Sequence, residues 1–339
     1  MVHKDGSWQW LLEGFKFELE AQVRPKTVEY YYDHARIFVR WVEAAGIAEP
    51  RLLTRRDING FFHHITSGSP SAKRNNGVGE AARHAESLRF HYYRGIKRFC
   101  HWLKVEGYLE NSPLDGIVFK PPKEPPIEPY KPEHKEKFLA VLDHDWRIAK
   151  TSRQKMLAAR DKAIICLLFE SGLRLQELAD LCLRDIDLNE HRVVVWFGKQ
   201  GKSRLSGFGP QTRKALWRYL SLRPTEVEGD KLWVTEEGRP IKSRTVQEIF
   251  RRLKKDAGLE HIRGLVHKTR HTFATTLLEH TGDMKACQNL LGHNTMRMTQ
   301  RYTEYVQVGH ALKYFNGTGP LDWMRDMGQK QANSSQPGR

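Results

Sequence analysis

Two short segments place an arginine beside a polar side chain that could orient it or move a proton. Arg174 follows Gly172, where one expected helix ends, and lies near the start of the next helix, whose amides favour an anion. Glu177 is one helical turn further on and could orient the guanidinium group. In the segment HKTRH, His267 and Arg270 are three residues apart, so a helix would put a titratable ring and a fixed cation on one face. Each pair alone is also typical of an ordinary helix surface, but both suit a bound phosphate.

Three further residues carry titratable or nucleophilic groups. Lys199 lies in GKQG, which predicts a tight turn between two strands. His293 stands at the end of the helix that LLGH predicts, and Tyr302 follows nine residues later. Taken singly, His293 would be a helix-capping residue and Tyr302 a core residue. Their order along the chain, interleaved with the two arginines, changes this interpretation because of a family resemblance.

In this order the residues resemble the tyrosine recombinase (phage integrase) family. The motifs that carry the resemblance are SGLRLQEL, the GKQGKSR turn, HKTRHTFATTLL and LLGHNTMRMTQRY, and it extends over about residues 133–305. Residues 1–120 match only in type, as a basic helical bundle similar to that family's core-binding domain. Lys-Thr follows His267 where the family often has Asp-Leu, a departure that we expect to alter only the surface.

The resemblance implies a site-specific DNA recombinase or integrase that cuts and rejoins DNA through a 3′-phosphotyrosyl intermediate and a Holliday junction. Tyr302 would be the nucleophile, with Tyr305 as a rival at a less usual interval from His293. Arg174 and Arg270 would clamp the nonbridging oxygens of the phosphate and neutralise the charge of the transition state.

The remaining roles come from the same resemblance. Lys199 would protonate the 5′ leaving oxygen, and His267 would act as general acid and base, accepting the tyrosine proton. His293 would donate a hydrogen bond to the phosphate, and Glu177 would support the site without touching DNA. No metal and no other cofactor would be needed, because the cations of the site and the covalent link already serve these purposes. The pair His267–His271 has a spacing that zinc sites use, but no HExxH glutamate or cysteine partner lies nearby.

Composition and pattern predict a mainly α fold in two domains. Residues 1–120 are expected to form a helical DNA-binding domain, with helices over 27–46, from Thr54 and over 82–106. Residues 121–132, PPKEPPIEPYKP, predict a proline-rich linker. Residues 133–325 are expected to form an α-rich catalytic domain that ends in a C-terminal tail, and 326–339 to be disordered.

A small antiparallel β-sheet is expected to interrupt the helices of the second domain. His191–Phe197 is rich in valine and predicts a strand, and a returning strand follows the turn at Lys199. Helices resume near Gln211 and at Thr245, where Thr245-x-x-Glu248 predicts a capping box.

The charge of the 339-residue chain predicts a polyanionic partner. The 56 Lys and Arg residues exceed the 40 Asp and Glu residues, for a net charge of +16, and the excess concentrates in residues 51–100 and 191–270. We expect double-stranded DNA as the partner, with Arg251, Lys254 and Lys255 among its contacts. The family resemblance further implies a homo-tetramer on two DNA sites.

The apolar residues after Tyr302 are expected to pack on a neighbouring protomer, with docking on the same domain as the alternative. These residues are Leu312, Tyr314, Phe315, Leu321, Trp323 and Met324. The four scattered cysteines, the lack of a long apolar stretch and the polar start of the chain predict a cytoplasmic protein without a membrane span.

Other functions remain as alternatives. A type IB topoisomerase uses similar residues but has lysine in place of His267, and the small helical N-terminal domain favours a recombinase. A catalytically silent DNA-binding accessory protein would lack a catalytic residue, whereas all six positions are filled. An RNA-binding module is disfavoured because no RNP or KH signature appears. The sequence leaves open whether the role is integration, transposition or chromosome resolution.

Overall fold

The computed structural model describes residues 7–67, 78–122, 127–196 and 203–314, and it divides into two compact units, Met1–Pro125 and Pro126–Arg339. The division falls inside the segment that we expected to be a linker. Ile127 and Tyr130 are nevertheless buried in the second unit, and the Tyr130 amide donates to Thr272 Oγ1 over 2.8 Å. Residues 121–122 and 127–131 of this segment lie outside regular secondary structure, but the apolar side chains of Ile127 and Tyr130 still pack.

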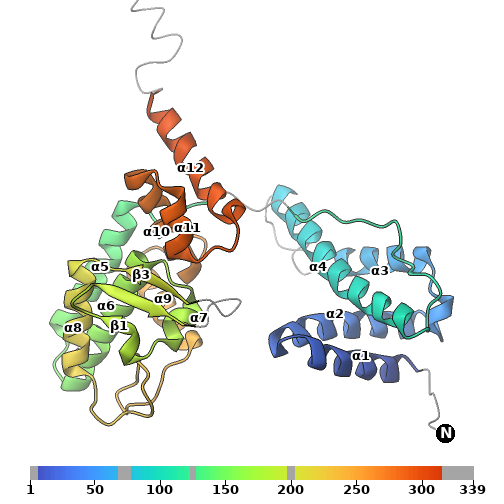
Figure 1. The fold of residues 1–339 in the computed structure, drawn as a ribbon, viewed down its shortest axis with the longest axis horizontal. Coiled ribbons are helices and arrows are strands. Elements are labelled where there is room, and N and C mark those ends of the chain that lie inside the picture. Colours follow the sequence, from blue (N-terminus) through green and yellow to red (C-terminus); the bar gives the residue numbers. More distant parts are fainter. Residues whose placement is uncertain (1–6, 68–77, 123–126, 197–202, 315–339) are drawn as a thin grey trace, which may run out of the picture. The chain divides into compact units, whose positions relative to one another are not determined.

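The described part of the first unit is helical (Figure 1), as predicted. Its helices are α1 (Trp8–Gln22), α2 (Pro25–Ala44), α3 (Arg55–Ser67) and α4 (Val78–Val105), with a short 3₁₀ turn at Pro50–Leu52. At the start of α3, the Asp57 carboxylate accepts hydrogen bonds from the Thr54 amide and hydroxyl over 2.9 and 2.6 Å. This confirms the predicted capping pair.

The core of the first unit is aromatic. Phe15 packs on Phe99 and Phe38 on Phe61, in both cases with ring centroids 5.1 Å apart. On α2 the buried residues recur at three- and four-residue intervals, which is why this sequence folds as an amphipathic helix. No helix in the described ranges is both long and apolar enough to cross a bilayer.

The second unit contains the candidate catalytic residues. Its helices are α5 (Pro132–Ile148), α6 (Ser152–Ser171), α7 (Leu175–Asp180), α8 (Pro210–Leu222), α9 (Ser243–Asp256), α10 (Val266–Thr281), α11 (Met284–Leu291) and α12 (Met296–Tyr314), with a 3₁₀ turn at Leu183–Asp185. Helix α6 is buried along most of its length, with Ile164, Ile165, Leu167 and Leu168 fully covered. It forms the centre against which α8, α10 and α5 pack.

A three-stranded antiparallel sheet completes this unit, which confirms the predicted mainly α fold with a small sheet. The strands β1 (Ile186–Asp187), β2 (Arg192–Val195) and β3 (Arg204–Gly207) pair in the order β1-β2-β3. Val195 pairs with Arg204, so Arg204 stands directly after the connection between β2 and β3. That connection, with Lys199, lies outside the described residues.

The capping box predicted at Thr245 is wrong. Helix α9 begins two residues earlier, at Ser243, so Thr245 lies within its first turn. The Glu248 carboxylate binds the Arg244 guanidinium over 3.0 Å instead of reaching back to an amide at the helix start. A pair of opposite charges at i,i+4 spacing therefore takes the place of the cap.

Candidate active site

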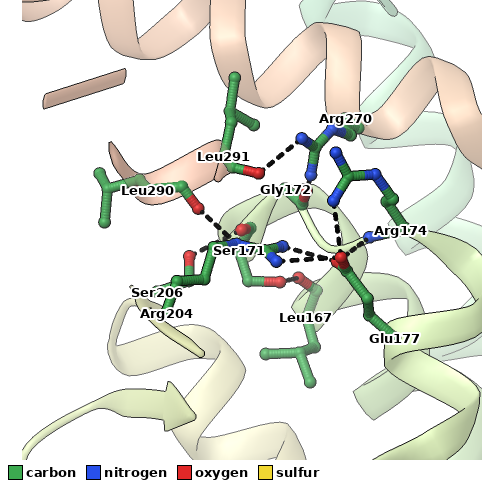
Figure 2. A network of polar contacts seen from close by, with 10 residues as sticks. All are labelled: Leu167, Ser171, Gly172, Arg174, Glu177, Arg204, Ser206, Arg270, Leu290 and Leu291. Carbon is green, nitrogen blue, oxygen red and sulfur yellow. Dashed lines mark hydrogen bonds and ion pairs between the residues drawn. The ribbon is translucent and has the colours of Figure 1, made fainter. Parts of the chain in front are cut away.

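Helix ends from distant parts of the second unit meet around a group of arginines (Figure 2). Gly172 ends α6 in the left-handed conformation, with φ at +61°, and a Cβ there would lie 2.4 Å from Phe273 Cδ1. Only glycine fits this turn, and the turn carries the chain directly to Arg174. The sequence SGLR thus sets where the first arginine enters the site.

Arg270 is the most deeply buried arginine of the group, with 1% of its surface exposed. Its Nη1 donates to the Gly172 carbonyl and its Nη2 to the Leu291 carbonyl, each over 2.6 Å. These carbonyls belong to the C-terminal ends of α6 and α11, where the helix dipoles favour a cation. Burial, followed by the charges of Arg174 and Arg204, lowers the pKa of Arg270 to about 10, so it stays charged at neutral pH.

Arg174 is the more accessible arginine, with 27% of its side chain exposed. It precedes α7, and its amide donates to Glu177 Oε2 over 2.8 Å while its Nη1 donates to Oε1 over 2.7 Å. The expectation that Glu177 orients Arg174 agrees with this geometry. The rest of the guanidinium fork can serve an anion from solvent.

Arg204 is a member of the site that the sequence reasoning missed. Its Nη1 and Nη2 donate to both oxygens of Glu177 over 2.9 and 2.6 Å, and its Nε donates to the Leu290 carbonyl over 3.0 Å. Burial would raise the pKa of Glu177, but the hydrogen bonds from Arg204 and Arg174 outweigh it and lower that pKa to about 2. The signal was present in the sequence, because Arg204 is the last residue of the quoted GKQGKSR motif.

Tyr302 on α12 is buried between histidines, with 4% of its surface exposed. Its hydroxyl lies 2.9 Å from His271 Nδ1, and its ring stacks on that of His293 with centroids 6.0 Å apart and planes at 8°. His293 Nδ1 in turn lies 2.9 Å from Thr299 Oγ1. Burial raises the pKa of the Tyr302 phenol, and the charge of Arg270 opposes that rise.

His271, not His267, makes the hydrogen bond with the Tyr302 hydroxyl. The two histidines lie one turn apart on α10, and their rings meet edge to face with centroids 4.6 Å apart. Burial, followed by the nearby positive groups, lowers the pKa of His267 and lowers that of His271 to about 4. Both rings are therefore neutral in the free protein at pH 7 and able to accept a proton. From the sequence, His271 is considered only as a possible metal ligand.

Tyr305, the rival nucleophile, lies in a different environment. It is 38% exposed, and besides burial the charges of Glu279 and Glu128 raise the pKa of its phenol. Carboxylates disfavour both a phenolate and a bound phosphate. The surroundings of Tyr302, which include the cation Arg270, favour a phenolate and a bound phosphate more than those of Tyr305 do.

The three residues expected to contact DNA on α9 divide into two kinds. Arg251 and Lys255 are exposed. Lys254 is buried, and its ammonium donates to the carbonyls of Ile262 and Gly264. The expectation for Lys254 is therefore wrong, because its charge is used to hold the chain that leads to α10.

Comparisons with known proteins find similar sequences. Residues 143–307 match the model of the phage integrase family. Tyrosine recombinase XerC of Alcanivorax borkumensis is 35% identical over 229 residues, which are 66% of this chain and 71% of that protein. Tyrosine recombinase XerC of Pseudomonas fluorescens is 30% identical over 306 residues, 89% of this chain and 92% of that protein.

Solved structures share the fold. The XerH site-specific recombinase in a post-cleavage complex with palindromic difH substrate has a TM-score of 0.67 at 18% identity, over 91% of this chain and 84% of that one. The Tn1549 transposon integrase in complex with transposon right end DNA has a TM-score of 0.61 at 18% identity, over 89% and 98%.

Proposed function

Because this chain belongs to the tyrosine recombinase (phage integrase) family and is a site-specific DNA recombinase, we propose that Tyr302 is its nucleophile. The Tyr302 oxygen attacks a DNA phosphorus and displaces the 5′ oxygen, which leaves a 3′-phosphotyrosyl link and a free 5′-hydroxyl. Attack by a 5′-hydroxyl from another strand reverses these bonds and regenerates the tyrosine. The observation that carries this proposal is the position of the Tyr302 hydroxyl, beside His271 and within the field of Arg270.

Arg174 and Arg270 hold the phosphate in this proposal. The two guanidinium groups come from different helix ends, and each uses part of its donors to fix itself in place. Their remaining N–H groups can bind nonbridging oxygens and neutralise the charge that grows in the transition state. Because both cations are fixed before DNA arrives, little reorganisation is needed during the reaction.

Histidines carry the protons in this proposal. His271 is the first acceptor of the Tyr302 proton, since its Nδ1 is already at hydrogen-bond distance from the hydroxyl. His267 remains the acid–base group toward the phosphate, because it shares a helix face with Arg270, and His293 donates to the phosphate. A bound phosphate adds negative charge beside these rings and raises their pKa, which makes them better bases than in the free protein. Lys199 protonates the leaving 5′ oxygen.

The partner is DNA, and we propose that four copies act on two duplex sites in the cytoplasm through a Holliday junction. The support for exchange between copies is α12, which Figure 1 draws extending away from α10 and α11 toward its C-terminal end. A mostly apolar cavity of about 440 Å³ between α5, α6 and α10 would receive the C-terminal segment of a neighbour. Residues 315–339 lie outside the described part of the chain.

The test is covalent capture on a nicked suicide DNA substrate, followed by denaturing electrophoresis and peptide mapping. The wild-type protein should form an adduct on Tyr302, and Tyr302→Phe should bind DNA with unchanged affinity but form none. Tyr305→Phe is the matched control and should keep the adduct. An adduct on Tyr305, or one that survives in Tyr302→Phe, would overturn the assignment. Relaxation of supercoiled DNA without a partner site would favour the topoisomerase alternative.

A further inference from the structure

We propose that Arg204 is a positioning residue for strand cleavage. It allows Glu177 to hold Arg174 without cancelling its charge, and it ties the β2–β3 hairpin to the turn that carries His293. This inference rests on the proposed function, because it concerns the same arginines and the same phosphate. It adds a residue to which neither the family resemblance nor the comparisons gave a role.

The first observation is the geometry of the Arg204 side chain, which is 9% exposed. Its guanidinium lies between the two oxygens of Glu177 and the Leu290 carbonyl, so all three of its nitrogens make hydrogen bonds (Figure 2). This is the planar fork that arginine offers and lysine lacks. The contact joins residues from β3, α7 and α11.

The second observation is the balance of charge around Glu177. A single carboxylate paired only with Arg174 would neutralise it and weaken the binding of a phosphate. Because Arg204 binds both carboxylate oxygens as well, the group of Arg174, Arg204 and Glu177 keeps a net positive charge. Arg270 adds a further cation from α10. Glu177 can therefore orient Arg174 while the site remains attractive to DNA.

The third observation is the close packing of Arg204 against the end of α11. A Cβ at Gly292 would lie 2.7 Å from Arg204 Cδ, and Gly292 has φ at +65°. Two residues along β3, the Ser206 hydroxyl donates to the Ser171 carbonyl over 2.7 Å. Strand β3 is thus fixed to the ends of α6 and α11 at once. A displacement of this strand would therefore shift Arg174, Arg270 and His293.

Loss of Arg204 should leave a signature in the pH dependence of cleavage. Among the described residues, the charged groups that face Glu177 are Arg174 just before α7, Arg204 from β3 and Arg270 from α10. With Arg204 present, Glu177 stays ionised throughout the usable pH range. Without it, burial is opposed less, the pKa of Glu177 rises, and its protonation at mildly acid pH releases Arg174. Cleavage by the variant should then decline toward acid pH more steeply than cleavage by the wild type.

The experiment measures single-turnover cleavage of the suicide substrate, DNA affinity and thermal melting for Arg204→Met and Arg204→Lys. Arg213→Met is the matched control, since Arg213 is an exposed residue of α8. We expect cleavage by Arg204→Met to fall on the order of 100-fold at neutral pH, as a misplaced reacting group can cause. DNA affinity should change far less than cleavage, because Arg204 is only 9% exposed and is paired with Glu177. Arg204→Lys should recover less than half of the lost activity on a logarithmic scale, and Arg213→Met should cleave normally.

The pH profile separates positioning from simple support of the fold. Cleavage by Arg204→Met should decline toward acid pH more steeply than cleavage by the wild type, and Glu177→Gln in the same chain should remove this extra decline. A profile parallel to that of the wild type, or a loss of cleavage that only follows a loss of DNA binding, would refute the inference. If Arg204→Met does not fold, the same comparison is made with Arg204→Lys. The wild-type adduct, mapped in the same assay, tests the role of Tyr302 independently.

Discussion

Arg204 and Arg270 bind neighbouring carbonyl oxygens at the end of α11. Arg204 Nε donates to Leu290 over 3.0 Å and Arg270 Nη2 donates to Leu291 over 2.6 Å. Both carbonyls lie in the last turn of the helix, where they lack partners within it, and both cations match the negative end of its dipole. His293 follows this turn directly, so the arginines also fix where that ring stands.

The two arginines proposed to bind phosphate should differ in their effect on stability. Arg270→Met leaves two buried carbonyls without donors, and we expect it to lower the free energy of unfolding by at least about 2 kcal/mol. Arg174→Met removes a partly exposed side chain and should cost less than about 1 kcal/mol. Both should slow cleavage severely. Urea denaturation and the suicide-substrate assay measure the two effects, and equal stability of the variants would contradict the description of Arg270.

The buried histidines should make stability depend on pH. Burial, with nearby arginines, lowers the pKa of His293 to about 3 and that of His271 to about 4, from 6.5 in the unfolded chain. The unfolded state therefore binds more protons between about pH 6.5 and 4, and stability should fall as the pH falls through this range, by up to about 1.4 kcal/mol per pH unit for each group. His293→Asn should flatten the curve. Denaturation midpoints at several pH values test this, and parallel curves would count against it.

The proposed role of Lys199 is to protonate the leaving 5′ oxygen, and the chemistry of that oxygen can test it. Lys199→Ala should slow cleavage of ordinary DNA, because the 5′ alkoxide then leaves without a proton. A substrate with sulfur at the 5′ bridging position should restore the rate, since a thiolate needs no proton to leave. Arg174→Met should gain no such rescue, because it acts on the nonbridging oxygens. Equal cleavage rates for the two substrates in Lys199→Ala would contradict the proposal that Lys199 protonates the leaving oxygen.

Gly292 and Gly258 form a natural pair for measuring the contact with Arg204. Both have φ at +65°, but a Cβ at Gly258 meets nothing within 4 Å whereas one at Gly292 meets Arg204 Cδ at 2.7 Å. Alanine at either position costs about 1–2 kcal/mol for the backbone conformation. Gly292→Ala should lose additional stability and most of its cleavage activity, and Gly258→Ala should keep its activity. Identical behaviour would mean that the contact with Arg204 does not matter.

Substitutions of the neighbouring residues Lys254 and Lys255 on α9 should affect different properties, namely stability and the salt dependence of DNA binding. Lys255→Met removes an exposed charge, and if this face binds phosphate it should reduce the salt dependence of DNA binding by about one unit of slope. Lys254→Met removes the donor for two carbonyls and should lower stability without changing that slope. Binding isotherms at several salt concentrations, with thermal melts, compare the two. A change of slope in Lys254→Met alone would reverse the assignment.

The sequence predicted what depends on local spacing. The pair Arg174–Glu177 follows from one helical turn, and the glycines of SGLR and LLGH mark where helices end. It could not predict that Arg204 reaches Glu177 and Leu290, 27 and 86 residues away, because that contact depends on how β3 packs against α7 and α11. His267 and His271 share a face of α10, and only the position of α12 decides which ring meets Tyr302. Lys254 looked like a DNA contact because charge alone does not reveal burial.

The contrast between Tyr302 and Tyr305 has a consequence for the free protein in water. Two phenols lie one helical turn apart, yet one is 4% exposed and the other 38% exposed. Oxidants and electrophiles dissolved in the surrounding solution will encounter Tyr305 far more often than Tyr302. The side chain that we propose as the nucleophile is thus shielded from adventitious modification during the time that the protein spends away from DNA.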